Sequence, residues 1–242
     1  MRIPSLRTRE LHAELMDGSS LPAADHASAL AGLARLNFLS GSSRAMWRQI
    51  VARVGGRCQG LRILDIGSGG GDVVLGLWNR AQRDGIKVEI LGLDRSPTAC
   101  SIASRRCLAA GDAISFQCAD VTAADLQGSY DVVTSTLFLH HLPRDEAIRV
   151  LARMAAAGRY LIVSDLRRSF IGYALAYAAC HLVTSSRIVR HDGPQSVANA
   201  FTLREWRDLC QAAGLHRAKV RRGWPWRVLV TVDREGGNDG PA

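Results

Sequence analysis

The feature that most constrains the fold is an alternation of short apolar runs with longer amphipathic segments. It begins at "LRILDIGSGGGDVVLGL" (61–77), where an apolar run, a glycine-rich loop and a second apolar segment follow one another. The alternation continues to residue 166, and its apolar runs suit strands buried on both faces. Strands that alternate with helices predict parallel βαβ units with right-handed crossovers.

The spacing of apolar residues predicts the elements one by one. Strands are expected over 61–66, 87–94, 114–120, 130–139 and 159–166, with helices over 71–85, 96–111 and 143–158 between them. Further helices are expected over 23–37 and 43–54, and over about 168–184 and 202–214. Two last strands are expected at 216–222 and 226–232, whereas residues 1–20 and the tail after 233 show no regular pattern.

Length and composition indicate one sheet-based domain that folds around a substantial core. The chain has 242 residues, of which 47% are hydrophobic, and this excludes global disorder. It lacks the roughly 18 consecutive apolar residues of a membrane span, and its N-terminus lacks the apolar region of a secretory signal. The six cysteines show no CxxC spacing, so we expect reduced, buried thiols in a cytoplasmic protein without disulfides or a zinc site.

The net charge of +9 raises the question of a nucleic-acid partner. The positive charge is almost all arginine, and the arginines are scattered along the whole chain. The densest basic stretch, 219–224, is typical of a solvated sheet edge. A nucleic-acid partner is therefore disfavoured.

The glycine-rich loop follows the first strand of the alternation, at the end of the sheet where such folds bind ligands. A dinucleotide fingerprint, GxGxxG, would need a third glycine where Asp72 stands, and an acid at a helix N-terminus would repel a pyrophosphate. The spacing present is Asp65-x-Gly67-x-Gly69-x-Gly71. A cationic ligand without phosphate suits these acids better.

That spacing resembles the D/E-x-G-x-G-x-G motif of class I S-adenosylmethionine-dependent methyltransferases. Three more elements fit in order: an acid ending the second strand ("LGLD"), "CADV" ending the third, and a hydroxyl after the fourth. The resemblance implies S-adenosyl-L-methionine as cofactor, bound by Asp65, Gly67, Ser68, Gly69, Gly71, Asp94, Arg95, Asp120, Val121 and Thr136. It also implies an α/β Rossmann-like fold with seven strands, the last antiparallel, and with helices on both faces.

Three of these predicted cofactor residues also have a structural interpretation. Asp94 can cap the helix that follows it, Asp120 can cap a turn, and Thr136 can be an ordinary strand-end hydroxyl. Asp65 is less ambiguous, because an acid inside an apolar strand needs a partner. We expect that partner to be the amides of the loop or the ammonium group of the cofactor.

Two finer resemblances concern the acceptor. "LNFLSGSSRAMWRQIV" resembles the entry segment of ubiquinone and menaquinone methyltransferases. "LFLHHL", "SDLRRSFIGYALA", "HDGPQSV" and "RRGWPWRVLVT" resemble bacterial small-molecule methyltransferases associated with type III polyketide synthases. These resemblances imply a small hydrophobic acceptor, phenolic or quinone-like, with methylation on oxygen slightly preferred over carbon.

The expected helix over 168–184 places five side chains on one face: Phe170, Tyr173, Tyr177, His181 and Thr184. Such a face suits the wall of a pocket for an aromatic acceptor and equally a core stripe with satisfied hydroxyls. It could also touch a bilayer as a peripheral contact, although it lacks the dense Lys and Arg expected there.

Two histidines follow the fourth strand, close to the expected position of the sulfonium. His140 and His141 are candidates for the base that takes a phenol proton, and His141 can alternatively pack structurally in its turn. His181 and His191 are the next candidates, and Asp165 ends the fifth strand at the same edge. No metal-ligand spacing is visible, so metal-independent chemistry is expected.

These observations predict a helical cap over 1–55 and a methyltransferase domain over 56–242, with a helical insertion at about 167–200. A monomer or homodimer fits the sequence equally. An RNA or protein methyltransferase is disfavoured because "STLF" (135–138) stands where an Asn-Pro-Pro-Tyr-like tetrad is expected. A non-catalytic S-adenosylmethionine-binding protein and a nicotinamide-dependent oxidoreductase are the remaining alternatives.

Overall fold

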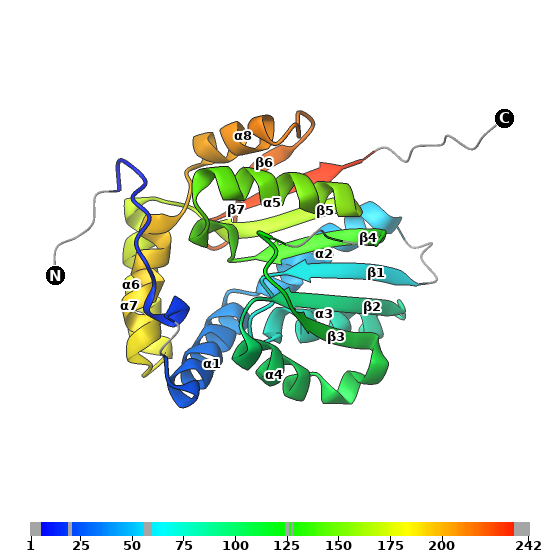
Figure 1. The fold of residues 1–242 in the computed structure, drawn as a ribbon, viewed down its shortest axis with the longest axis horizontal. Helices are drawn as coiled ribbons and strands as arrows, with labels where there is room; N and C mark the ends of the chain where they lie inside the picture. Colours follow the sequence, from blue (N-terminus) through cyan, green and yellow to red (C-terminus); the bar gives the residue numbers. More distant parts are fainter. Residues whose placement is uncertain (1–5, 19–20, 56–59, 124–125, 127, 235–242) are drawn as a thin grey trace.

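The computed structural model describes residues 6–18, 21–55, 60–123, 126 and 128–234. Its centre is a seven-stranded sheet of order β3-β2-β1-β4-β5-β7-β6 (Figure 1). The strands are β1 (Leu61–Ile66), β2 (Val88–Asp94), β3 (Ile114–Cys118), β4 (Tyr130–Thr136), β5 (Gly158–Leu166), β6 (Lys219–Gly223) and β7 (Arg227–Asp233). The first five are parallel, and β7 runs antiparallel to both of its neighbours. The predicted fold class and antiparallel last strand are confirmed.

The helices follow the predicted spacing with small changes at their ends. They are α1 (Ala23–Leu39), α2 (Ser42–Val54), α3 (Asp72–Arg83), α4 (Pro97–Arg106), α5 (Arg144–Ala157), α6 (Phe170–Val183), α7 (Arg187–Asn199) and α8 (Leu203–Ala212). Short 3₁₀ turns are η1 (Leu15–Asp17), η3 (Leu108–Ala113) and η4 (Leu139–His141). α7 lies within the helical insertion expected at about 167–200, but its own bounds are not predicted, since Pro194 lies inside it and proline normally ends a helix.

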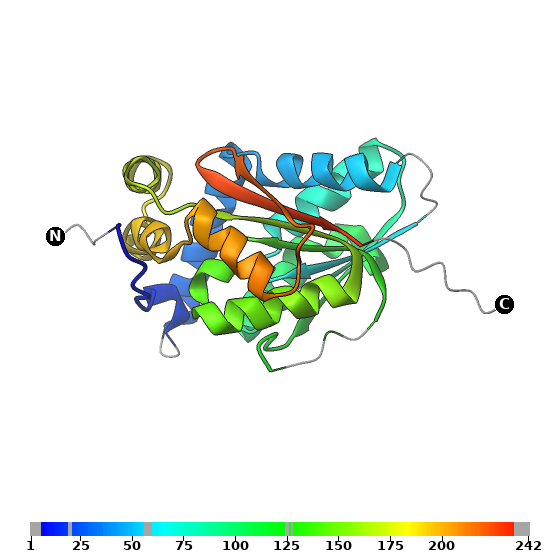
Figure 2. The ribbon, with the colours of Figure 1, turned by 90° about the horizontal axis from the view of Figure 1, so that it is seen from above.

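The two faces of the sheet carry separate apolar cores, as the alternation along β1 requires. Leu61 and Ile63 pack with α2 and α3, whereas Leu64 and Ile66 pack with α5 and α8. Figure 2 shows these helix layers on opposite sides of the sheet. α2 belongs to the core on one face of the sheet, and the helical cap over 1–55 stays a prediction.

The remaining helices gather at the carboxyl ends of the parallel strands. There α1 contacts α4, α6 and α7, and Figures 1 and 2 show α6 and α7 together beyond the strand ends. Residues 6–18, here called the strap, cross this edge before α1. The chain reverses its strand order between β1 and β4, and the ends of these two strands form the crevice in which such folds bind ligands.

Five cysteines lie in the described residues, and all five are free; Cys58 lies outside them. Cys100, Cys107, Cys180 and Cys210 are buried, and burial raises the pKa of each thiol to about 11. Cys118 is exposed, which corrects the expectation that every thiol is buried. None of the helices found in the described residues could cross a bilayer by length and hydropathy.

Candidate active site

The glycine loop turns sharply between β1 and α3. Gly67 has φ 70° and Gly69 has φ 51°, a region that side chains disfavour. A Cβ on Gly67 would lie 2.5 Å from the ring of Phe138, so glycine is required by packing as well as by conformation. The amides of Gly67 and Ser68 both donate to the carbonyl of Leu93, which fixes the loop to β2.

Asp65 is buried at the end of β1, with 2% of its surface exposed. Its Oδ1 accepts a hydrogen bond of 2.7 Å from the hydroxyl of Thr134 on β4. This differs from the expected bonds to loop amides, because the loop amides turn toward β2 instead. Burial raises the pKa of Asp65 to about 7, against the opposing effect of the Thr134 bond.

Asp94 lies at the carboxyl end of β2, next to the loop. It accepts from the amide of Gly69 at 2.8 Å and from the amide of Ser96 at 2.9 Å. Ser96, not Asp94, caps α4, since its hydroxyl accepts from Ala99. The structure therefore removes the capping alternative and leaves Asp94 facing the loop.

Two further predicted cofactor residues follow β3. Asp120 is exposed, and its Oδ1 accepts from both the amide and the hydroxyl of Thr122 at 2.8 and 2.7 Å. These bonds hold the pKa of Asp120 below its usual range. The predicted turn-capping alternative is thus present in the structure, and Val121 beside it is buried.

Thr136 is the last residue of β4, next to Ser164 of β5. Its hydroxyl is buried, yet it has no hydrogen-bond partner among the described residues. The next residue, Leu137, has φ 58° without being glycine, and such strain is concentrated at functional sites. A buried hydroxyl without a partner among the described residues, together with the glycine loop and the acid at the end of β2, fits a polar cofactor such as S-adenosylmethionine.

His140 and Asp165 form the shortest acid–base contact of the site. Asp165, at the end of β5, lies 2.6 Å from His140 Nδ1, and its other oxygen accepts from the His140 amide at 3.1 Å. Both side chains are buried. Despite burial, the charge of His140 and its hydrogen bond hold the pKa of Asp165 below its usual range. When the imidazole of His140 is neutral, the ionised carboxylate favours the proton on Nδ1, and Nε2 is then an acceptor.

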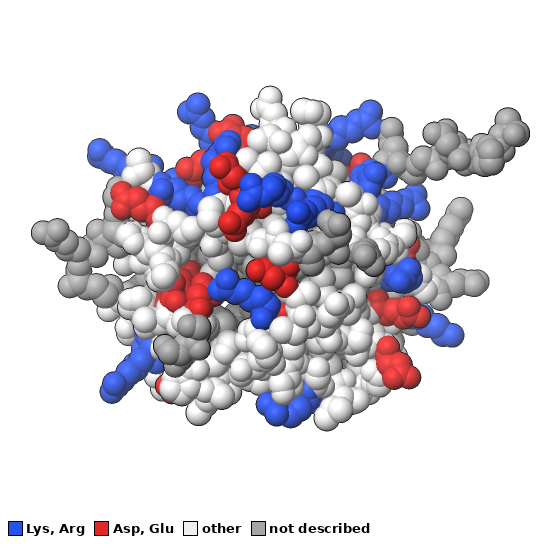
Figure 3. Space-filling model, in the orientation of Figure 1, with Lys and Arg blue, Asp and Glu red and all other residues white. Residues whose placement is uncertain are grey.

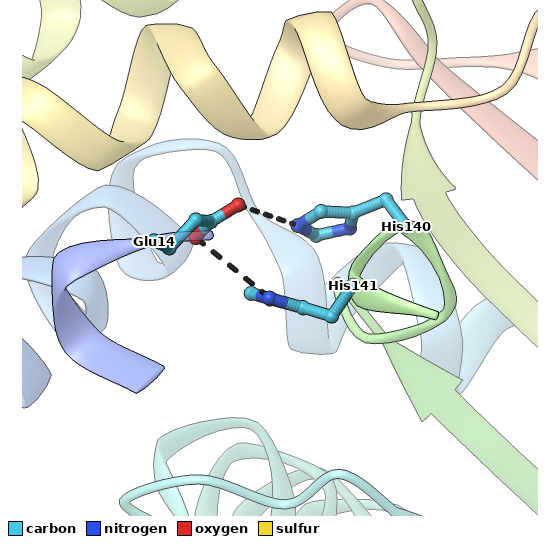
Figure 4. Close-up of side chains that lie close together, drawn as sticks. All are labelled: Glu14, His140 and His141. Atoms are coloured by element: carbon cyan, nitrogen blue, oxygen red, sulfur yellow. Dashed lines mark ion pairs between the residues drawn. The ribbon is translucent and has the colours of Figure 1, made fainter. Parts of the chain in front are cut away.

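The strap brings two acids, Glu14 and Asp17, to the histidines, and Figure 4 shows Glu14 facing both rings. Glu14 is buried and lies 4.0 Å from His140 Nε2 and 3.8 Å from His141 Nδ1. Asp17 lies 3.2 Å from His141 Nδ1 and 2.8 Å from Arg95. Burial alone would lower the pKa of His141, but the bond to Asp17 and the charge of Glu14 raise it to about 9. His141 is thus charged at neutral pH and suits holding the strap better than accepting a proton.

Glu14, His140 and His141 are also of the types that ligate metals, with one atom of each within 4.8 Å of the others. Each already has a protein partner. The hydroxyl of Ser196 donates to Glu14 at 2.8 Å, Asp165 holds His140, and Asp17 holds His141. Because each side chain of the cluster already has a partner and His141 is charged, the cluster favours acid–base chemistry over metal binding. Metal-independent chemistry stays a prediction.

The side chains predicted to contact the acceptor do not lie on one wall. Tyr173 is buried, whereas Tyr177 and His181 are exposed and stack on each other with ring centroids 4.2 Å apart. Burial raises the pKa of Tyr173. His191 lies on α7 with its Nδ1 2.8 Å from Asp192.

Three contributors to the site are not identified from the sequence alone: Glu14, Asp17 and Thr134. The first two lie in a segment without periodicity, so no pattern marks them. The only signal for Thr134 is a hydroxyl residue in the fourth strand, which also contains Ser135 and Thr136.

Comparisons with known proteins agree with this geometry. A family model described as a methyltransferase domain matches residues 63–159. A ubiquinone biosynthesis O-methyltransferase of Ralstonia nicotianae is 29% identical over 181 residues, which cover 74% of this chain and 71% of that protein. One from Cupriavidus pinatubonensis is 32% identical over 127 residues, covering 51% and 49%.

Solved structures share the fold at low identity. The plantazolicin methyltransferase in complex with SAH has a TM-score of 0.60 at 13% identity, covering 88% of each chain. Magnesium protoporphyrin IX methyltransferase from Synechocystis PCC 6803 with bound SAM has a TM-score of 0.53 at 18% identity, covering 91% of this chain and 88% of that one.

The sheet order, the glycine loop with its acids and the matching domain define a class I S-adenosylmethionine-dependent methyltransferase. The chain contains a methyltransferase domain over residues 63–159 and is an S-adenosylmethionine-dependent methyltransferase. Within the family, it is similar to the ubiquinone biosynthesis O-methyltransferases described above.

Proposed function

We propose that the enzyme methylates a hydroxyl oxygen of a small phenolic or quinol-like acceptor and that His140 takes the proton. The observation that carries this proposal is the buried Asp165–His140 pair, 2.6 Å apart at the carboxyl edge of the sheet. The similarity to ubiquinone biosynthesis O-methyltransferases supports oxygen over carbon as the methylated atom. The location of the reaction in the cytoplasm remains an expectation from the sequence.

Asp94, Thr136 and the glycine loop would hold S-adenosylmethionine, which supplies an electrophilic methyl group on a sulfonium when bound. The chain's own task is then to bind and orient the acceptor and to remove its proton. His140 Nε2 accepts the hydroxyl proton, and Asp165 stabilises the imidazolium that forms. Glu14, 4.0 Å from Nε2, adds a second negative charge on the side of the ring where the proton arrives.

The predicted acceptor contacts are Tyr173, Tyr177, His181 and His191. Of these four side chains, only that of Tyr173 is buried, so we infer that it touches the acceptor ring. Tyr177, His181 and His191 lie at the surface, where they would meet an acceptor only as it enters.

The test compares His140→Ala and Asp165→Asn with His191→Ala as a matched control, because His191 also pairs with an aspartate but is half exposed. With a phenolic acceptor, turnover is expected to fall about 10²–10⁴-fold in the first two variants and little in the control. Calorimetric titration with S-adenosylmethionine should show that all three still bind it. Unchanged turnover in His140→Ala would reject the role of His140.

A nucleic-acid substrate is less well supported. Figure 3 shows Lys and Arg interspersed with Asp and Glu over the face drawn, without one continuous basic surface. A phosphate-binding surface requires positive charge gathered on one side. Methylation of phenols but not of RNA fragments would support the small-molecule proposal.

A further inference from the structure

Two cysteines lie where β2, β3 and α4 meet. Cys118 is the last residue of β3 and pairs in register with Asp94, the last residue of β2. Cys100 lies near the start of α4, and Figure 1 shows this helix packed beside β3. The fold therefore brings together two thiols that stand 18 positions apart in the sequence.

The hydrogen bonds of the two cysteines converge on consecutive carbonyls. The Cys100 thiol donates to the carbonyl of Asp94 at 3.5 Å, and the amide of Ala119, directly after Cys118, donates to the same carbonyl at 3.0 Å. The Cys118 thiol donates to the carbonyl of Arg95 at 3.4 Å. The two sulfur atoms are therefore neighbours, and the Cys118 thiol is a hydrogen-bond partner of Cys100.

The two thiols differ in access to solvent. Cys118 is exposed, whereas Cys100 is buried. Burial, the charge of Asp94 and the neighbouring Cys118 thiol raise the pKa of Cys100 to about 11, so Cys100 stays protonated at neutral pH. An oxidant from solvent therefore reaches Cys118 first, with Cys100 as the second sulfur. An accessible cysteine next to a resolving one is typical of redox-sensing sites.

We propose that Cys100 and Cys118 form an oxidisable dithiol, which a peroxide converts to a disulfide that weakens cofactor binding. This inference goes beyond the methyl-transfer proposal and does not depend on the role of His140. Its effect on the cofactor rests on the prediction that Asp94 and Asp120 bind S-adenosylmethionine.

The reaction proceeds in two steps when hydrogen peroxide is the oxidant. The sulfur of Cys118 attacks one peroxide oxygen, the O–O bond breaks, and Cys118 becomes a sulfenic acid while its thiol proton leaves with hydroxide as water. The sulfur of Cys100 then attacks the sulfur of Cys118. The S–S bond forms, and the sulfenic oxygen leaves as hydroxide, which takes the Cys100 proton to give a second water. The two thiols lose two electrons, and the peroxide gains them.

The disulfide would change the cofactor edge of the sheet. A covalent bond draws the two sulfurs closer than any contact between thiols, and neither sulfur can still donate to the carbonyls of Asp94 and Arg95. Asp94 holds the glycine loop, because its carboxylate accepts from the Gly69 amide at 2.8 Å. Asp120 follows Cys118 by two residues. A shift at the dithiol therefore reaches the predicted cofactor contacts on both strands.

The test treats the full chain with hydrogen peroxide and maps its cysteines by mass spectrometry of the peptides. A linked pair of peptides that contain Cys100 and Cys118, lighter by two hydrogen atoms, is expected. Affinity for S-adenosylhomocysteine, measured by calorimetry, should fall at least about tenfold, the loss expected when one hydrogen bond to a charged group is disturbed. Addition of dithiothreitol should restore it.

Three variants separate this disulfide from general oxidation. Cys100→Ala and Cys118→Ala should each form no such link, and Cys118→Ala should keep the affinity of the reduced wild type after peroxide treatment. The matched control is Cys180→Ala, which removes a buried thiol on α6 and should respond to peroxide like the wild type.

Oxidation of Cys118 to a sulfinic acid, or its linkage to another cysteine, with no bond to Cys100 overturns the proposal. A bond between Cys100 and Cys118 that leaves the affinity for S-adenosylhomocysteine unchanged also overturns it, as does an equal loss of affinity in Cys118→Ala. Neither readout requires an acceptor, so a failure of the role proposed for His140 would leave the result of this test unchanged.

Discussion

At the scale of single residues, the site depends on acids whose surroundings set their charge. Asp65 and Asp165 are both fully buried, yet burial raises the pKa of the first to about 7, while His140 holds the pKa of the second low. The difference follows from their partners, a hydroxyl for Asp65 and an imidazole for Asp165. One acid is therefore poised to titrate near neutrality, and the other stays ionised.

The titration of Asp65 predicts a pH dependence of cofactor affinity. An ionised Asp65 attracts the ammonium group of S-adenosylmethionine, and a protonated one does not. Affinity measured by calorimetry should therefore fall as pH drops below about 7, by up to about tenfold per pH unit. Asp65→Asn should remove this pH dependence. The control Asp94→Asn should weaken binding at every pH but keep the pH dependence. A slope that survives in Asp65→Asn would contradict the prediction.

His141 predicts a pH dependence of stability. Its pKa is about 9 in the folded chain against an ordinary 6.5, so its stabilising effect is full below about pH 6.5 and is lost as pH rises through 9. The change should amount to roughly 2–3 kcal/mol. Urea unfolding between pH 6 and 10 measures it, and His141→Gln should flatten the curve over that window. The lowered pKa of Asp17 places the loss of its own contribution at acid pH instead.

At the scale of elements, the strap is the segment that completes the site. Arg9 anchors it by donating to the carbonyls of Asn199, His140 and Leu142, and its guanidinium lies 3.8 Å from the centre of the Phe201 ring. Burial lowers the pKa of Arg9 to about 10, so it remains charged at neutral pH. The strap is thus fixed to both η4 and α7.

Removing this anchor should loosen the strap without unfolding the sheet. Arg9→Ala leaves buried carbonyls without a donor, at a cost of about 1–3 kcal/mol. Limited proteolysis should cleave the variant faster within residues 6–18 than the wild type. S-adenosylhomocysteine is expected to slow cleavage of residues 1–55 in the wild type, and no added protection would count against their closing over the cofactor.

Elements with strong periodicity could be predicted from the sequence, and those without it could not. The strands β1 to β5 could be predicted from their apolar runs, because both faces of the sheet are covered. The bounds of α7 could not be predicted, because Pro194 lies inside it. The strand expected to run to 139 ends at Thr136, because Leu137 adopts a positive φ. Likewise, the glycine loop identifies the cofactor edge, but the strap acids are positioned only by tertiary contacts such as Ser196 to Glu14.

At the scale of the whole molecule, cofactor binding should appear as global stability. A ligand that binds only the folded chain at 100 times its Kd adds about 2.7 kcal/mol. Thermal unfolding should therefore shift upward with saturating S-adenosylhomocysteine and stay unchanged with NAD, since Asp72 stands at the helix N-terminus where a pyrophosphate would lie. A shift with NAD of equal size would contradict the assignment of the glycine loop.

The strap also connects parts of the chain that are made at different times. Glu14 accepts a hydrogen bond from Ser196, which lies 182 positions later in the chain, and Arg9 donates to the carbonyl of Asn199, 190 positions later. During synthesis the strap residues leave the ribosome long before their partners on α7. The carboxylate that faces His140 can reach its place only after α7 has been made, so a nascent chain that still lacks α7 can form its first strands without forming a finished active site.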